Sequence, residues 1–174
     1  MYLVSIYFDE KTNKHIQRLI NQVAERTGNR FMLDGEVPPH ITISAFETQD
    51  EASAIEALDS LVEELRRGNL TWASVGQFFP YVIYITPVLN VYLHGLSESV
   101  YNALSSLEDV LISSHYQPFQ WLPHTTIAKK LSKEEMQIAF EVLQSGFGIF
   151  EGEVVRIGLA KPNPYRDIAT WELK

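Results

Sequence analysis

Hydrophobic residues recur along the chain with two periods, which predicts a mixture of strands and helices. Runs rich in β-branched and aromatic residues favour strands, and apolar positions three and four residues apart favour helices. Polar residues such as Asp9 and Asp50 stand where N-caps are expected, and Gly-Asn pairs stand where helices are expected to end. The first half is predicted to form strands over 2–8, 40–46, 70–79 and 81–86, and helices over 10–27 and 51–67.

The second half repeats this order of elements. Ser132 and Glu135 form the pattern of a capping box at the start of one of its helices. The predicted strands are 88–93, 124–130, 149–160 and 166–173, and the helices run from Ser97 or Ser99 to about Ser114 and from Ser132 to about Ser145. Each half therefore reads β-α-β-α-β-β, with first strands starting at 2 and 88. We expect one domain of two lobes that share an interface, with halves of residues 1–87 and 88–174.

Composition removes several classes of function. With 174 residues and 45% hydrophobic content, the chain can bury a substantial core. It has no cysteine, which excludes disulfides, cysteine nucleophiles and thiolate metal sites. A net charge of −8 argues against binding along duplex DNA, although a local pocket can still take a phosphate. We see neither a signal peptide nor a membrane segment, so we expect a cytoplasmic protein without a membrane partner.

One short motif occurs once in each half. Residues 38–43 read Pro-Pro-His-Ile-Thr-Ile and residues 122–127 read Leu-Pro-His-Thr-Thr-Ile, so both contain Pro-His-x-Thr-Ile at the start of a strand. Alternate residues of a strand share a face. His40 therefore points the same way as Thr42, and His124 the same way as Thr126. If the halves pack about a pseudo-two-fold axis, the two pairs face each other across a groove.

Two opposed imidazoles provide the groups that displacement at phosphorus requires. The ordinary pKa of histidine, about 6.5, allows one ring to act as general base and the other as general acid near neutral pH. Threonine hydroxyls can donate to the non-bridging phosphate oxygens. Two histidines with two threonines are a poor set of metal ligands, so we expect neither a metal nor a cofactor.

These motifs resemble those of the two-histidine (2H) phosphoesterase superfamily, which includes the 2′-5′ RNA ligase-like proteins and cyclic nucleotide phosphodiesterases. The resemblance implies a bilobal α+β fold, with antiparallel sheets lining a groove and helices outside. It also implies opening of 2′,3′-cyclic phosphates or cleavage of 2′-5′ linkages, with ligation as the reverse reaction. His40 and His124 would be base and acid, and Thr42 and Thr126 would hold the phosphate. Lys129 matches the basic residue that such proteins often carry after the second motif.

Aromatic residues near the motifs are candidates for holding a base or ribose, because bases stack on such rings. These candidates are Tyr7, Phe119, Trp121 and Tyr165, and core packing is the alternative for each. Arg166 is either a site residue or an ordinary surface charge. His94 can approach the groove, whereas solvent exposure explains His15 and a helix end explains His115.

The expected partner is a nucleotide or RNA end that bears a cyclic or 2′-5′ phosphate, and a monomer suffices because both lobes supply the site. Two alternatives stay open on the sequence. The first is a non-catalytic nucleotide- or RNA-binding protein on the same scaffold, which would bind saturably without turnover. The second is a purely structural domain, in which the two histidines lie far apart or are buried against backbone.

Overall fold

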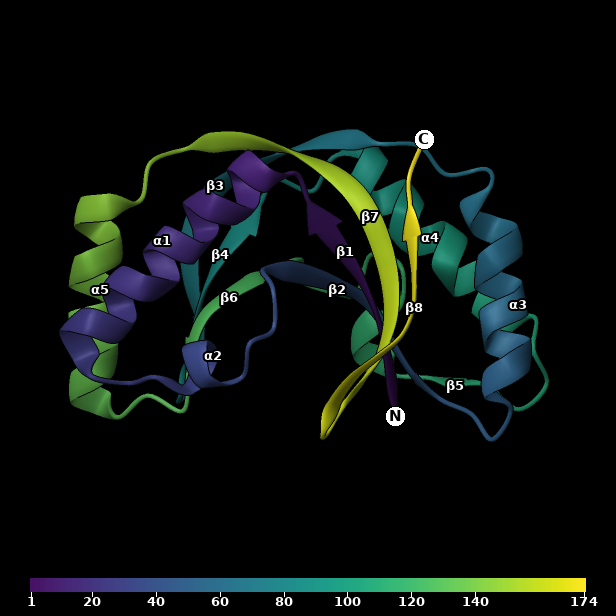
Figure 1. The fold of residues 1–174 in the computed structure, drawn as a ribbon, viewed down its shortest axis with the longest axis horizontal. Coiled ribbons are helices and arrows are strands. Elements are labelled where there is room, and N and C mark those ends of the chain that lie inside the picture. Colours follow the sequence, from purple (N-terminus) through teal and green to yellow (C-terminus); the bar gives the residue numbers. More distant parts are fainter.

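Eight strands form a single antiparallel sheet in the computed structural model, which describes residues 1–174 (Figure 1). The strands are β1 (Tyr2–Phe8), β2 (His40–Glu47), β3 (Gly68–Phe78), β4 (Val82–Pro87), β5 (Leu111–Ile112), β6 (Thr125–Lys129), β7 (Phe150–Pro162) and β8 (Tyr165–Glu172). The helices are α1 (Glu10–Thr27), α2 (Phe31–Asp34), α3 (Glu51–Val62), α4 (Val91–Ser105) and α5 (Lys133–Gly146), with a 3₁₀ turn at Ser114–Tyr116. The predicted α+β class is confirmed.

Strands that correspond in the two halves of the chain occupy equivalent positions on the two sides of the sheet. The path is β5-β2-β1-β7-β3-β4-β6, with β8 paired to β7. By chain position β1 corresponds to β4, β2 to β6 and β3 to β7, since these strands start 80 to 85 residues apart (2 and 82, 40 and 125, 68 and 150). The central link is the β7–β3 pair, and the two strands with the histidine motifs lie toward opposite ends of the path.

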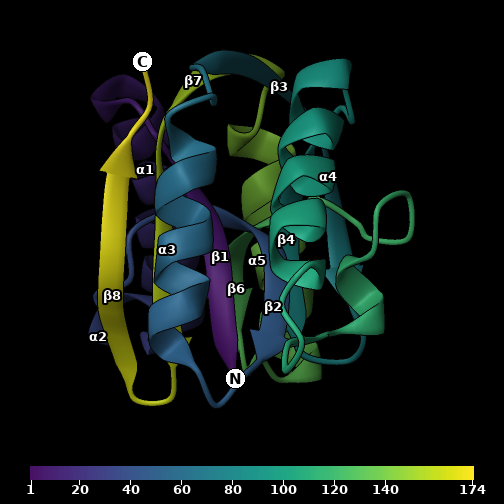
Figure 2. The same ribbon diagram turned by 90° about the vertical axis from the view of Figure 1, so that its right-hand side faces the viewer.

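The helices cover the sheet in two exchanged pairs. Helix α1 packs against α5 on one side, and α3 packs against α4 on the other (Figures 1 and 2). Each pair thus combines one helix from before β4 with one from after it. Helix α1 buries an apolar stripe at helical spacing, Ile16, Leu19, Ile20 and Val23, as its sequence predicts. None of the five helices has the length and apolar character needed to cross a bilayer.

The predicted strand over 88–93 is wrong, because the chain there enters helix α4. Asn90 is the N-cap, and its side chain accepts a hydrogen bond from the Leu93 amide at 2.8 Å. Val88 and Val91 are exposed, so the apolar run that suggested a buried strand is largely on the surface. The helix ends at Ser105 rather than near Ser114. The repeat of elements restarts at β4 instead.

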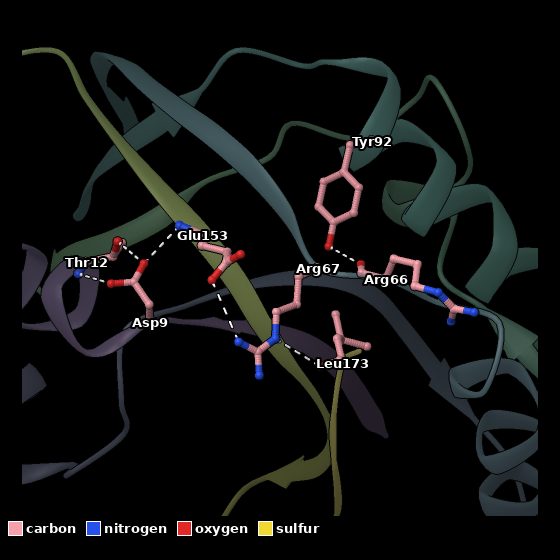
Figure 3. A network of polar contacts seen from close by, with 7 residues as sticks. All are labelled: Asp9, Thr12, Arg66, Arg67, Tyr92, Glu153 and Leu173. Carbon is pink, nitrogen blue, oxygen red and sulfur yellow. Dashed lines mark hydrogen bonds and ion pairs between the residues drawn. The ribbon is translucent and has the colours of Figure 1, made fainter.

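A network of polar contacts holds the end of the sheet where β3 and β7 meet (Figure 3). Asp9 caps α1 through Thr12 and also accepts from the Glu153 amide of β7 at 2.9 Å. The Glu153 carboxylate lies 3.9 Å from the Arg67 guanidinium, and Arg67 Nε donates to the Leu173 carbonyl at 2.9 Å. Asp9 thereby ties the start of α1 to β7, and Arg67, just before β3, ties β7 to the residue that follows β8.

Two glycines let tyrosine rings lie against the face of the sheet that carries the histidines. Tyr84 covers Gly76 so closely that a Cβ there would lie 2.6 Å from the tyrosine hydroxyl oxygen and 2.7 Å from its ring. The Tyr7 ring covers Gly158 in the same way, since a Cβ at Gly158 would lie 2.9 Å from that ring. Gly76 and Gly158 hold equivalent places in β3 and β7, so each side of the sheet uses one glycine to seat one tyrosine.

The substitution Gly76→Ala should lower the free energy of unfolding by about 1–3 kcal/mol, because the added methyl group must displace the Tyr84 ring. Urea denaturation of the two proteins measures this difference. Gly148→Ala is the matched control, since no atom lies within 4 Å of a Cβ at that position. Equal stability of the two variants would show that Tyr84 is not held against Gly76.

Candidate active site between the two histidine strands

The two motif histidines are anchored in the same way. The Nδ1 atom of His40 lies 2.8 Å from the carbonyl oxygen of Pro38, and Nδ1 of His124 lies 2.8 Å from that of Leu122. A carbonyl oxygen can only accept, so in each ring Nδ1 must carry the hydrogen. This leaves Nε2 of each neutral imidazole with a free lone pair, which is the atom that can take up a proton.

The two motif threonines lie on the histidine face of their strands. Thr42 pairs with Ser5 of β1 in the ladder, and their hydroxyl oxygens are 3.2 Å apart. Thr126 pairs with Tyr84 of β4 and lines the groove. Its neighbour Thr125 points the other way, where it is fully buried and accepts a hydrogen bond from the Trp72 indole at 3.2 Å. Of these two adjacent threonines, Thr126 is therefore the one that faces the groove, as alternation along the strand predicts.

A β-bulge at the last residue of each motif, an isoleucine, changes which residues face the groove. Successive residues of β4, Ile83 and Tyr84, pair with Ala128 and Thr126, so one residue of β6 is extra. Because of this bulge Lys129 shares the face of Thr126, although a spacing of three would place them on opposite faces of a regular strand.

The same irregularity occurs in β2, where Ser44 and Thr42 pair with successive residues of β1. The residue that corresponds to Lys129 there is Ala45, which pairs with Leu3 and is buried. The frame of the site is therefore repeated, but its cation comes from one side alone.

A pocket of about 350 Å³ opens beside the first histidine. It gathers His40, Thr126, Lys129, Tyr7 and Tyr165 from four separate strands. Helix α2 and the turn between β7 and β8 complete its wall. The remaining lining residues are Leu3, Ser5, Phe31, Met32, Gly35, Val37, Ala160, Pro162, Asn163 and Pro164.

Tyr7 and Tyr165 join the histidine wall to the β7–β8 hairpin. Their hydroxyl oxygens are 3.2 Å apart, and the Tyr165 hydroxyl donates to Asp167 at 2.7 Å, so Tyr7 is the donor to Tyr165. The Arg156 guanidinium lies 4.7 Å from the centre of the Tyr7 ring, close enough for a cation–π contact. Burial raises the pKa of the Tyr7 hydroxyl, which keeps it protonated as a donor.

Aromatic rings form the wall on the side of the second histidine. The Phe78 ring meets His124 edge to face at 4.8 Å between centroids, and the Tyr84 ring lies 5.4 Å from His124. On the side of the first histidine, the Tyr7 ring lies 6.1 Å from the ring of His40, its ladder partner. Neither Phe78 nor Tyr84 was expected from the sequence to line the site. The pattern that could have identified them is the alternation of side chains along β3 and β4, which places both rings on the histidine face.

Burial sets the charge state of both histidines. Desolvation is the main cause that lowers the pKa of His40 below its ordinary value of 6.5, and the nearby His124 and Lys129 lower it further. Desolvation and Lys129 likewise lower the pKa of His124. The Nδ1 hydrogen bonds to backbone carbonyls oppose these shifts only in part. Both rings are therefore neutral at pH 7 in the free protein.

Several other sequence candidates lie away from this pocket. Trp121 is buried in the core, and Phe119 is 75% exposed, with its ring 3.7 Å from that of His94. Neither Phe119 nor Trp121 lines the pocket. Arg166 lies 3.8 Å from the Glu51 carboxylate, and His15 packs against Phe150. Nowhere in the chain do three or more histidine, aspartate or glutamate side chains gather so that they could hold a metal ion.

Comparison with known proteins now defines the class. The model of the 2′-5′ RNA ligase superfamily matches residues 9–165, so the chain belongs to this superfamily of phosphoesterases and RNA ligase-like enzymes. Its fold is similar to the crystal structure of a phosphoesterase (TM-score 0.62, 15% identity, covering 99% of this chain and 97% of that one). It is equally similar to E. coli LigT complexed with 3′-AMP (TM-score 0.62, 16% identity, 99% and 97%).

A further similar fold is that of Kluyveromyces marxianus Usb1, with a TM-score of 0.50, 10% identity, and coverage of 99% of this chain and 96% of that one. The comparison with curated proteins finds no relative of the chain. At these identities the solved structures establish the shared fold, and the family model establishes membership.

The depressed histidine pKa values make the stability of the protein depend on pH. Near and below pH 6.5 the unfolded chain binds protons at these histidines that the folded chain does not. The free energy of unfolding therefore falls as the pH drops below 6.5, until the folded pKa values are passed. Replacing both rings, as in the double variant His40→Gln and His124→Gln, should weaken this dependence.

Urea unfolding at about pH 7.5 and about pH 5.5 measures the effect. The wild-type protein should lose more stability between these pH values than the double variant does. The exposed His115→Gln variant is the control and should behave as the wild type. A double variant with the full wild-type loss would contradict burial of the histidines as its cause.

Proposed function

We propose that the chain is a metal-independent phosphoesterase that hydrolyses 2′,3′-cyclic phosphates or 2′-5′ phosphodiester bonds of RNA or nucleotides, with ligation as the reverse reaction. The observation that carries this proposal is the matched anchoring of His40 at the start of β2 and of His124 immediately before β6. Each ring presents Nε2 as its free nitrogen, and strands β2 and β6 come close to each other. Membership of the 2′-5′ RNA ligase superfamily supports the same chemistry.

The reaction needs two proton transfers, and the two imidazoles can carry out both. One neutral ring takes a proton from the attacking water at Nε2 while the water oxygen bonds to phosphorus. The other ring, protonated, gives its proton to the ribose oxygen as the phosphorus–oxygen bond to that oxygen breaks. Either histidine can be the base, with the other as the acid, and these roles reverse with the direction of reaction.

The neutral state of both rings in the free protein fits this cycle. A phosphate bound between them adds negative charge, which raises the pKa of both histidines and allows one ring to take up the proton that the acid step requires. In this proposal the hydroxyls of Thr42 and Thr126 and the ammonium of Lys129, which share one face of the sheet, hold the non-bridging oxygens. In the proposed site, one histidine therefore becomes protonated, as the acid step requires, only when the substrate is bound.

Aromatic rings flank the place proposed for the phosphate on both sides. Phe78 and Tyr84 lie beside His124, and their rings offer a surface on which a nucleobase can stack. Tyr7 and Tyr165 lie beside His40 and add hydroxyl groups suited to a ribose. We infer that the phosphate is taken together with at least one nucleoside.

Each of the substitutions His40→Ala and His124→Ala should lower turnover by about 10²–10⁴-fold, since each removes one proton transfer. A panel of 2′,3′-cyclic nucleotides and 2′-5′-linked oligonucleotides, with products identified by mass spectrometry, measures the loss and shows which oxygen keeps the phosphate. His115→Ala is the control and should retain wild-type turnover. EDTA should leave the rate unchanged, and the rate should show a bell-shaped dependence on pH.

Near-full activity of either histidine variant would contradict the two-histidine mechanism. Saturable binding of these ligands without turnover by the wild-type protein would instead identify a non-catalytic binding protein. Circular dichroism of each variant checks that a lost rate does not reflect a lost fold.

A further inference from the structure

We propose that the site extends over helix α2 into a second phosphate subsite, formed by Phe31 and Lys130, that selects RNA ends over single nucleotides. This inference rests on the proposed function and specifies its substrate class. Three features at the mouth of the pocket support it. Two lysines lie over one exposed ring, and a strained backbone directs one of them there. Neither lysine is paired with a carboxylate.

The first feature is the convergence of two ammonium groups on the Phe31 ring. Lys130 Nζ lies 4.4 Å and Lys129 Nζ 5.8 Å from its centre, both within range of a cation–π contact. Phe31 and Lys129 also line the pocket of His40, whereas Lys130 does not. The ring is therefore shared between the reacting site and a second cation immediately outside it.

The second feature is the backbone that presents Lys130. This residue has φ of 59°, in the left-handed region that a non-glycine residue enters only at some cost in energy. Its carbonyl oxygen accepts a hydrogen bond from the Asn29 side chain at 3.2 Å, which ties the end of β6 to the segment before α2. The turn thus holds two successive lysines, Lys129 and Lys130, over the same ring, where a regular strand would direct them to opposite faces.

The third feature is charge. Within an acidic chain of net charge −8, neither Lys129 nor Lys130 forms an ion pair with a carboxylate. The acidic residue of α2, Asp34, is instead paired with Arg30 at 3.2 Å. Two adjacent cations without an internal counter-charge fit an anionic ligand.

A polynucleotide meets these requirements better than a single nucleotide does. A nucleotide in the pocket of about 350 Å³ brings its reacting phosphate to His40 and Lys129, which leaves Lys130 with nothing to bind. An RNA end supplies a second phosphate one nucleotide away for Lys130 and a second base for the Phe31 ring, which is 39% exposed. The favoured substrate is accordingly single-stranded RNA of at least two nucleotides.

The test compares hydrolysis of a trinucleotide that ends in a 2′,3′-cyclic phosphate with hydrolysis of the 2′,3′-cyclic mononucleotide. We expect the wild-type protein to prefer the trinucleotide in kcat/KM, and Lys130→Gln to reduce this preference roughly fivefold to tenfold through the loss of one charged phosphate contact. The slope of log kcat/KM against log salt concentration for the trinucleotide should become shallower by about 0.7. Lys133→Gln removes the same charge three residues away and should leave both quantities as in the wild type.

Equal kcat/KM values for the two substrates, or an unchanged preference in Lys130→Gln, would overturn the subsite and leave the proposed hydrolysis intact. If neither substrate is hydrolysed, the proposed function itself fails. In that case calorimetric binding of the two ligands to the wild type and to Lys130→Gln still decides the subsite. Tighter trinucleotide binding that Lys130→Gln weakens would support it, and equal binding would overturn it.

Discussion

The arrangement of the site depends on the pairing of β3 with β7. This ladder, from Gly68 opposite Val154 to Trp72 opposite Phe150, is the one strand pairing that joins the two sides of the sheet. Beyond this ladder the two strands separate. Strand β7 pairs with β1 and β8 on one side of the sheet, and β3 pairs with β4 on the other. The ladder fixes how the two sides are set relative to each other, and β2 and β6 come close to each other as a consequence.

On this repeated frame the two sides carry different chemistry. The histidines, their carbonyl anchors, the bulges and the tyrosine-seating glycines all occur twice. The cation does not, because Lys129 corresponds to Ala45, and the residue opposite the motif threonine is Tyr84 on one side and Ser5 on the other. In the proposed function the symmetric parts hold the phosphate, and the unequal parts make the two ends of the groove chemically different. A substrate with different groups on its two sides would bind in one orientation.

Much of this site follows from sequence reasoning, because its central parts depend on local rules. Alternation along a strand predicts that His124 and Thr126 share a face, and the capping box at Ser132 is present as its pattern indicates. The rest depends on contacts between distant segments. No local pattern reveals the bulge that turns Lys129 into the groove or the place of Phe31 over it. The apolar run at 88–93 misleads for a related reason, since an N-cap at Asn90 overrides the strand preference of its neighbours.

The proposed function requires both imidazoles to contact one phosphate group. A crystal structure of the protein with a nucleoside 2′-phosphate bound decides whether they do, because the position of the phosphorus atom is then observed. We expect phosphate oxygens to lie within hydrogen-bond distance of Nε2 of both His40 and His124, with Lys129 bound to the same phosphate. A phosphate held by only one of the two histidines, or bound outside the groove, would contradict it.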